Sequence, residues 1–308
     1  MDFISFVLRR VGRLLLTVLL ISTIIFFVIR VIPGDPALVI AGIDATEADI
    51  AAIRAKLGTD RPLTAQYFQW LSRIIRFDFG KSLTSEEPVI KLILERFPLT
   101  LSLAVMGIAI SLLIALPLGV LSAVKRWSLW DYLGMIISQL GMAIPSFWLG
   151  IMLLLLFAVI IPVFPLFGSG TIRHLLLPAI ALGFARAAVL LRLTRASMIE
   201  ELSKEYVVTA RAKGLTENMV KFKHTLRNAL LPVITIAGIQ LGYMLGGAII
   251  IEQVFSLPGL GRLFLYGVYQ RDFTLIQGGV VFVALIFSLI NFIVDLLYSA
   301  LNPRIRIS

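Results

Sequence analysis

Long apolar runs separated by polar stretches dominate the pattern of hydrophobic and polar positions along the chain. Each run is long enough to cross a hydrocarbon core of about 30 Å as a helix. The pattern therefore predicts an all-α, polytopic membrane protein with six transmembrane helices. The six runs lie at about 11–32, 99–124, 132–161, 175–198, 229–251 and 276–301.

Two of these runs need separate comment. The third is over-long and contains Pro145, so we expect it to kink or break there. The first follows Arg9, Arg10 and Arg13, as a signal peptide would, but it exceeds the usual apolar region of roughly 7–15 residues and no small-residue cleavage site follows it. We expect an uncleaved first helix; removal as a signal peptide is the alternative.

The longest polar interruption, residues 33–98, is mixed and charged, with helical periodicity in 48–57 and 62–75. We therefore divide the chain into 1–98, a first transmembrane helix with an extracytoplasmic segment, and 99–308, a core transmembrane domain. Gly80, Lys81 and Ser82 spell the end of a phosphate loop. Ile75 stands where that motif needs its first glycine, however, and no apolar strand precedes it. ATP binding by this chain is excluded.

Composition and charge fix the class and the orientation. The chain is 59% hydrophobic, and it contains no cysteine, which excludes disulfides, thiolate metal sites and a cysteine nucleophile. Six spans place both termini on one face, whose segments carry 15 Lys and Arg against 6 Asp and Glu, whereas the opposite segments carry 11 of each. The positive-inside rule makes the terminal face cytoplasmic. The net charge of +10 thus indicates orientation and contact with lipid headgroups, not nucleic-acid binding.

Few residues in the sequence could support catalysis or metal binding. The only two histidines, His174 and His224, fall on opposite faces of the predicted topology, so they form neither a metal pair nor a catalytic dyad. We predict a protein that is not an enzyme and has no metal site. The ionisable candidates inside the spans are Arg30, Arg186 and Asp295, and Asn291 is a further polar candidate. Interhelical pairing and a place on a translocation path both remain open for Arg186, Asn291 and Asp295.

The fifth run has glycines at a regular spacing. Gly238, Gly242 and Gly246 are four residues apart and so share one helix face. Such a face lets another helix approach closely, or it borders a pore. Gln240 and Tyr243 alternate with these glycines and are candidates to line a path for a transported molecule.

One long polar segment between two apolar runs carries a pattern of its own. Small residues precede Gly214, basic residues surround them, and an apolar row follows at helical spacing. We predict a helix, a turn at Gly214 and a second amphipathic helix, together forming a docking element on the cytoplasmic face. The small residues are Thr209, Ala210 and Ala212, the nearest basic residues are Arg211 and Lys213, and the apolar row is Leu215, Met219, Phe222, Leu226 and Leu230.

This segment resembles the EAA loop of binding-protein-dependent ABC importer permeases, although Val208 replaces the glutamate of the general pattern and Pro232 lies five positions late. The variant TARAKGL followed by HTLRNALLP is similar to the peptide and nickel branch, which includes the dipeptide and oligopeptide permeases. The likeness extends over nearly the whole chain. It includes IPGDPA at 32–37, IPSFWLG at 144–150, IIEQVFSLPGLGRL at 250–263 and LNPRIR at 301–306.

The resemblance implies a type I ABC importer permease of a bacterial or archaeal cytoplasmic (inner) membrane that forms half of an import path. It further implies a second homologous permease, two ABC ATPase subunits that bind ATP and Mg in place of this chain, and an extracytoplasmic solute-binding protein. Residues 200–232, called the coupling segment below, would then seat on an ATPase. The residues implied in that contact are Thr209, Ala210, Arg211, Ala212, Lys213, Gly214, Leu215, Phe222 and Leu226.

The cargo that the resemblance favours is a short peptide. Nickel, a metallophore, glutathione and an oligosaccharide are rivals within the same class of importer. A channel or secondary carrier that works without an ATPase is the alternative from a different class.

Overall fold

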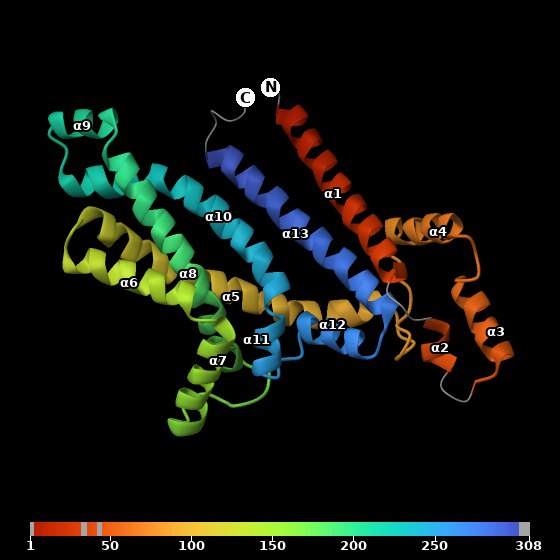
Figure 1. Cartoon of the computed structure of the whole chain (residues 1–308). Helices are drawn as coiled ribbons and strands as arrows, with labels where there is room; N and C mark the ends of the chain where they lie inside the picture. The colour runs from red at the N-terminus through yellow and green to blue at the C-terminus, as the bar shows by residue number, and fades with distance from the viewer. Residues whose placement is uncertain (1–2, 32–35, 42–44, 302–308) are drawn as a thin grey trace.

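A computed structural model describes residues 3–31, 36–41 and 45–301, and within these ranges the chain is helical (Figure 1). Apart from one isolated bridge between Lys81 and Pro88, the described ranges contain no β-structure. The prediction of an all-α protein is confirmed.

Five helices are long and apolar enough to cross a membrane. The α6–α7 pair forms a sixth span if its two halves are counted together. These halves meet at an angle of 98° across Ile144 and Pro145. Pro145 has extended backbone angles and no N–H to donate, which explains the predicted break. The long helices are α1 (Phe3–Val31), α5 (Val89–Val124), α8 (Ile172–Leu202), α10 (Leu226–Gly247) and α13 (Phe273–Leu301), and the bent pair is α6 (Leu129–Ala143) with α7 (Ser146–Leu154) and π-helix η1 (Leu155–Ile160).

Short helices connect the long ones. The predicted helices at 48–57 and 62–75 are present as α3 and α4, whereas the boundary expected at residue 98 falls inside α5. Figure 1 shows α9, the first turns of α1 and the last turns of α13 on one side of the molecule, with α7, α11 and α12 on the other. The short elements are α2 (Pro36–Ala41), α3 (Glu47–Leu57), α4 (Leu63–Ile75), α9 (Glu205–Ala212), π-helix η2 (Met219–Thr225), α11 (Ile249–Val254) and α12 (Leu260–Tyr269).

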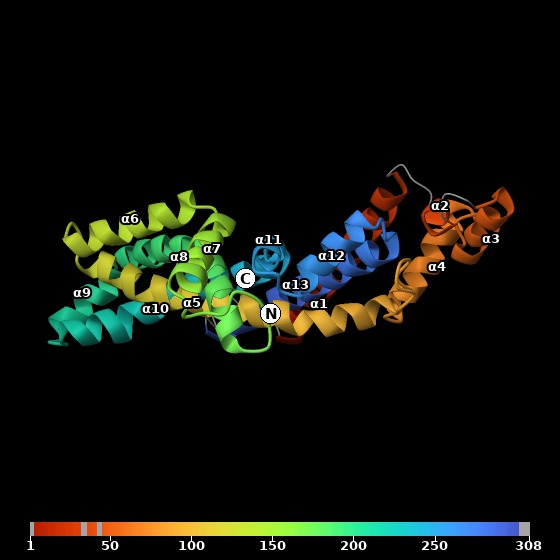
Figure 2. The same ribbon diagram turned by 90° about the horizontal axis from the view of Figure 1, so that it is seen from below.

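Helices α5 and α8 pack closest together and form the centre of the fold. A Cβ atom on Gly183 would lie 2.6 Å from the carbonyl oxygen of Gly107, so position 183 leaves no room for a side chain between the two helices. Ser111 Oγ donates to the carbonyl oxygens of Gly107 and Gly183, at 2.8 and 2.7 Å. Small residues with such hydrogen bonds are the usual means of holding helices together in lipid. Figure 2 shows α5 running from the α6–α9 end of the molecule to the α2–α4 end.

Buried carboxylates tie other elements to this centre. Asp131 of α6 accepts two hydrogen bonds from Arg195 of α8, at 2.7 and 3.0 Å, and its side chain is 1% exposed. Asp272 accepts hydrogen bonds from Ser82 Oγ at 2.5 Å and from the backbone N–H of Leu83 at 3.0 Å. Ser82, the last of the residues that spell the end of a phosphate loop, thus bonds to a carboxylate of the chain itself.

A third buried carboxylate, Glu252, holds the α11–α12 turn against α5. Thr100 Oγ1 donates to its Oε1 at 2.6 Å, and the Arg262 N–H donates to its Oε2 at 3.1 Å. Thr100 Oγ1 also accepts from the Leu260 N–H at 2.9 Å. The Arg262 guanidinium bonds to the Ser256 carbonyl, so it does not neutralise Glu252. Burial therefore raises the pKa of the Glu252 carboxyl above its ordinary value of 4.5, against the opposite effect of its hydrogen bonds.

The raised pKa of Glu252 predicts a pH-dependent stability. Folded chains hold this proton at pH values where unfolded chains have lost it, so stability falls as the pH rises from about 4.5 through the raised pKa. Glu252→Gln keeps the shape of the side chain and removes the proton. We expect the unfolding temperature of the purified Gln variant to lack this part of the pH dependence. Glu47→Gln, at an exposed carboxylate, is the control, and parallel curves for wild type and Glu252→Gln would contradict the assignment.

Candidate functional site

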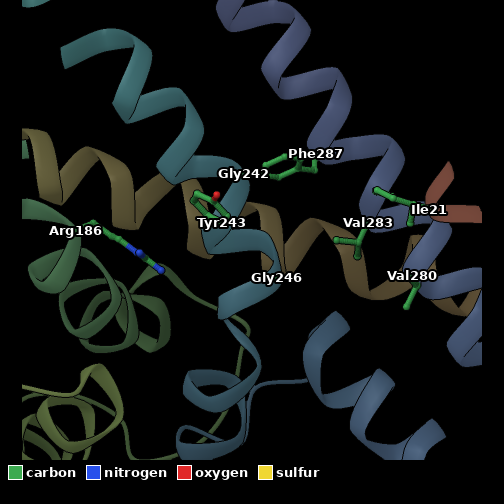
Figure 3. Close-up of a pocket in the computed structure, with 9 residues that line it drawn as sticks. Ile21, Arg186, Gly242, Tyr243, Gly246, Val280, Val283 and Phe287 are labelled. Carbon is green, nitrogen blue, oxygen red and sulfur yellow. The ribbon is translucent and has the colours of Figure 1, made fainter. Parts of the chain in front are cut away.

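A cavity of about 650 Å³ opens between α1, α8, α10 and α13, and its wall is mostly apolar (Figure 3). Long segments distant in the sequence therefore contribute to one space. The lining residues are Ile21, Arg186, Gly242, Tyr243, Gly246, Val280, Val283, Ala284 and Phe287.

The three glycines of α10 divide between packing and lining. A Cβ atom on Gly238 would collide with Val294, and one on Gly242 would lie 2.7 Å from the Phe287 ring, so both positions admit α13 of the same chain. A Cβ atom on Gly246 would meet nothing within 4 Å, and Gly246 lies on the cavity wall. Gly238 and Gly242 thus permit close packing with α13, and Gly246 leaves space at the cavity wall.

The polar residues between these glycines have different surroundings. Tyr243 is 55% exposed, and its ring lies 5.6 Å from that of Phe287 in the cavity wall. Gln240 is not among the lining residues: it is 8% exposed, and within the described ranges its Oε1 finds no hydrogen-bond partner.

Arg186 is the charged residue of the cavity wall. It follows the tight α5–α8 contact at Gly183 by one helical turn, so that contact fixes where its side chain begins. Figure 3 shows the guanidinium extending from α8 towards the part of α10 that bears Tyr243 and Gly246. In the part of the chain that the structure describes, no carboxylate pairs with it and no acceptor bonds to it. An arginine at the centre of a membrane helix costs about 2.5–3.5 kcal/mol or more to place, so this position is notable.

The two other ionisable candidates inside the spans, Asp295 and Arg30, have partners. Asp295 of α13 forms an ion pair with Arg10 of α1. Together with Asn291 it lines a second, smaller cavity of about 240 Å³. Arg30 donates to Gln66 Oε1 at 3.1 and 3.0 Å and stacks over Phe26. Interhelical pairing therefore accounts for Asp295 and Arg30, but not for Arg186.

The coupling segment contains the predicted turn. Helix α9 ends at Ala212, and Gly214 has φ +77°, a conformation that favours glycine. Val207 and Ala210 of α9 form a small buried cluster with Val220 of η2, and Leu215 packs against it. This cluster holds α9 against η2. The small side chain of Ala210 is thus buried inside the coupling segment. The side chains of the neighbouring residues are exposed: Thr209, Arg211, Ala212 and Lys213.

The expected second amphipathic helix differs in two ways from the prediction. It is the π-helix η2 and continues directly into α10, so it is not a separate element. The predicted apolar row also fails to form one buried stripe: Met219 and Phe222 are 39% and 55% exposed, while Val220 and Thr225 are buried. A π-helix bonds residue i to residue i+5 and so shifts the buried face from the α-helical positions.

The exposed surface of the coupling segment combines apolar and charged side chains. Val208 and Phe222 are 61% and 55% exposed. Glu217 links α9 to η2, with its carboxylate oxygens 2.8 Å from Arg211 Nε and 3.1 Å from Lys221 Nζ. These two cations lower the pKa of Glu217. The ion pairs of Glu217 therefore link charged side chains within this surface.

Two sequence stretches noted above lie wholly or partly outside the described residues: IPGDPA at 32–35 and LNPRIR after 301. Of the other two, IPSFWLG forms the α6–α7 break, and IIEQVFSLPGLGRL forms the α11–α12 turn around Glu252. Reasoning from the sequence missed the roles of Asp131, Asp272 and Glu252. A lone carboxylate beside an apolar run was their only signal.

The sequence matches two family descriptions. Residues 115–307 match the binding-protein-dependent transport system inner membrane component family, and residues 3–104 match the N-terminal region of such membrane components. The chain is 41% identical over 305 residues to the glutathione transport system permease protein GsiC of Salmonella paratyphi A, covering 98% of this chain and 99% of that protein. The GsiC protein of Pectobacterium atrosepticum is 42% identical over 303 residues, with the same coverage.

Solved structures share the fold. An inward-facing MetNI methionine ABC transporter superposes with a TM-score of 0.57 at 21% identity, covering 69% of this chain and 97% of that one. An amino acid ABC transporter solved with histidines gives a TM-score of 0.50 at 18% identity, covering 70% and 94%. At these identities the likeness concerns the fold alone. The sequence matches carry the assignment: this chain belongs to the binding-protein-dependent transport system inner membrane component family, as the non-catalytic, inner-membrane permease subunit of an ABC importer.

Proposed function

We propose that this permease forms one half of the import path for short peptides, with glutathione as the first candidate, and that a solute-binding protein delivers them at the outer face. The observation that carries this proposal is the cavity between α1, α8, α10 and α13. Its volume of about 650 Å³ lies within the range of about 300–1,000 Å³ that is usual for small-molecule sites. Relatives of 41–42% identity over the full length are named as glutathione permeases, and glutathione is itself a tripeptide.

The chemistry of the cavity favours a peptide over a bare metal ion. Its wall is apolar apart from Arg186 and the Tyr243 hydroxyl. Within the described ranges no three His, Cys, Asp or Glu side chains gather, and the guanidinium repels cations. A nickel ion would lack ligands here, whereas a peptide has apolar and anionic groups that suit such a wall.

The proposed assembly follows from what the single chain leaves exposed. The cavity is largely open to its surroundings, and a second, homologous permease would cover it. The coupling segment would seat on one of two ATPase subunits, with Val208 and Phe222 as apolar contacts and Lys213 and Lys223 beside them. In this arrangement both termini and the basic face would lie in the cytoplasm.

Coupling would use the continuity of η2 and α10. Residues from Met219 to Gly246 form one helical rod, with the ATPase contact at one end and the cavity wall at the other. A displacement of Phe222 would therefore reach Tyr243 and Gly246 through helix backbone. Closure of the ATPase dimer would then shift the population of cavity states, as expected for a two-state transporter.

Reconstitution tests the proposed function directly. Proteoliposomes containing this chain, its partner permease and both ATPase subunits should accumulate labelled glutathione only when ATP and the solute-binding protein are supplied. Omitting the ATPases is the control. Uptake by this chain alone would show a channel or secondary carrier instead, and a complete complex that hydrolyses ATP but imports no glutathione would overturn the cargo.

The turn at Gly214 offers a matched pair of variants. Space is open around it, but its φ of +77° strains other residues. Gly214→Val should deform the turn at a cost of about 1–3 kcal/mol, whereas Gly214→Asn tolerates this conformation. We expect glutathione uptake per ATP hydrolysed to fall severalfold in the Val variant and to change little in the Asn variant.

The control for Gly214→Val is Gly170→Val, at a glycine with open space and no positive φ. Equal uptake per ATP in the Val and Asn variants of Gly214 would argue against a role for this turn in coupling.

A further inference from the structure

Arg186 occupies the middle of a membrane helix. It is 14 residues from the first and 16 from the last residue of α8 (Ile172–Leu202), which corresponds to about 21 and 24 Å along the axis at 1.5 Å per residue. Lipid phosphates lie at the surfaces of a hydrocarbon core of about 30 Å. At this position a headgroup is out of reach of the side chain.

The described part of the chain supplies no counter-ion for this charge. Asp295 is paired with Arg10, Asp131 with Arg195, and Glu252 with Thr100 and the Arg262 N–H. The nearest wall is Tyr243, glycine and aliphatic side chains. A guanidinium that faces a cavity and lacks an anion is ready to bind one that enters.

We propose that Arg186 binds a carboxylate of the cargo as it passes through the cavity, so that the permease itself selects for free carboxyl groups. The inference rests on the proposed peptide cargo and extends it. A guanidinium is planar and always charged, and it meets a carboxylate through two parallel hydrogen bonds. The same charge repels cationic peptides. A site on a transport path has to bind loosely enough to release, which a single arginine in an open cavity permits.

A carboxylate could reach Arg186 from a second source, the facing permease subunit. In that case Arg186 would hold the two subunits together and would not sense the cargo. The two sources differ in what changes when the arginine is removed. Loss of a cargo contact affects one carboxylate of the ligand, whereas loss of a subunit contact affects every ligand and weakens assembly.

The test measures binding to the complete transporter complex in nanodiscs without the solute-binding protein, so that the selectivity of that protein does not contribute. Three labelled probes are compared: glutathione, its glycine C-terminal amide, and its analogue amidated at the γ-glutamyl α-carboxyl. We expect wild type to bind one of the amides about tenfold more weakly than glutathione, the effect of losing a charge-assisted hydrogen bond. Arg186→Gln should bind glutathione as weakly as wild type binds that amide, with no further discrimination.

Two further variants complete the design. Arg186→Lys keeps the charge without the two-pronged geometry and should fall between wild type and Arg186→Gln. Arg192→Gln removes an exposed charge from the same helix, outside the cavity wall, and should behave as wild type.

The remaining outcomes overturn the inference. These are no measurable binding by wild type, unchanged discrimination in Arg186→Gln, or an equal loss for all three probes with weakened co-purification of the subunits. Failure of the cargo assignment shows separately, as a wild-type complex that hydrolyses ATP but imports no glutathione.

Discussion

The close contact between α5 and α8 is the constraint on which the rest of the structure depends. Gly183 lets α8 approach the Gly107 carbonyl of α5, and Ser111 Oγ donates to the carbonyl oxygens of Gly107 and Gly183. Lipid supplies no hydrophobic force between helices, so this approach and its hydrogen bonds have to hold them. Arg186 follows Gly183 by one turn. The contact that stabilises the centre of the fold therefore also positions the charge of the cavity.

Buried carboxylates organise the elements around that centre, each with a different set of donors. Asp131 takes an arginine, Asp272 takes hydroxyl and backbone N–H groups, and Glu252 takes a threonine and a backbone N–H. A buried charge is costly unless it is paired or hydrogen-bonded, so each fixes the segment that supplies its donors. By contrast, no acceptor within the described residues bonds to the Arg186 guanidinium, so Arg186 does not join two segments as these carboxylates do.

The length of the apolar runs predicts the helices because a helix must be long and apolar to cross a membrane. Pro145 and Gly214 predict the breaks at their positions because each depends on the backbone conformation of that residue alone. The hydrogen-bond partners of the buried carboxylates are not local in the sequence. Asp272 meets Ser82 across 190 positions, and no spacing rule reaches that far. The buried face of η2 was also unpredictable, since a π-helix shifts the face that α-helical periodicity assigns to Met219 and Phe222. The regular spacing of the α10 glycines is visible in the sequence. Which of them pack against α13 and which line the cavity depends on the placement of α13.

The central claim is that the coupling segment and the cavity move as one body through η2 and α10. The chain has no cysteine, and Gly246 has open space for a new side chain. In the assembled transporter, the rate at which a membrane-impermeant thiol reagent modifies Gly246→Cys reports on access to the cavity. The account predicts that trapping the ATPases in their closed, nucleotide-bound state slows modification from the cytoplasmic side and speeds it from the outer side. Equal rates with and without trapped nucleotide, in a complex that still hydrolyses ATP, would contradict it.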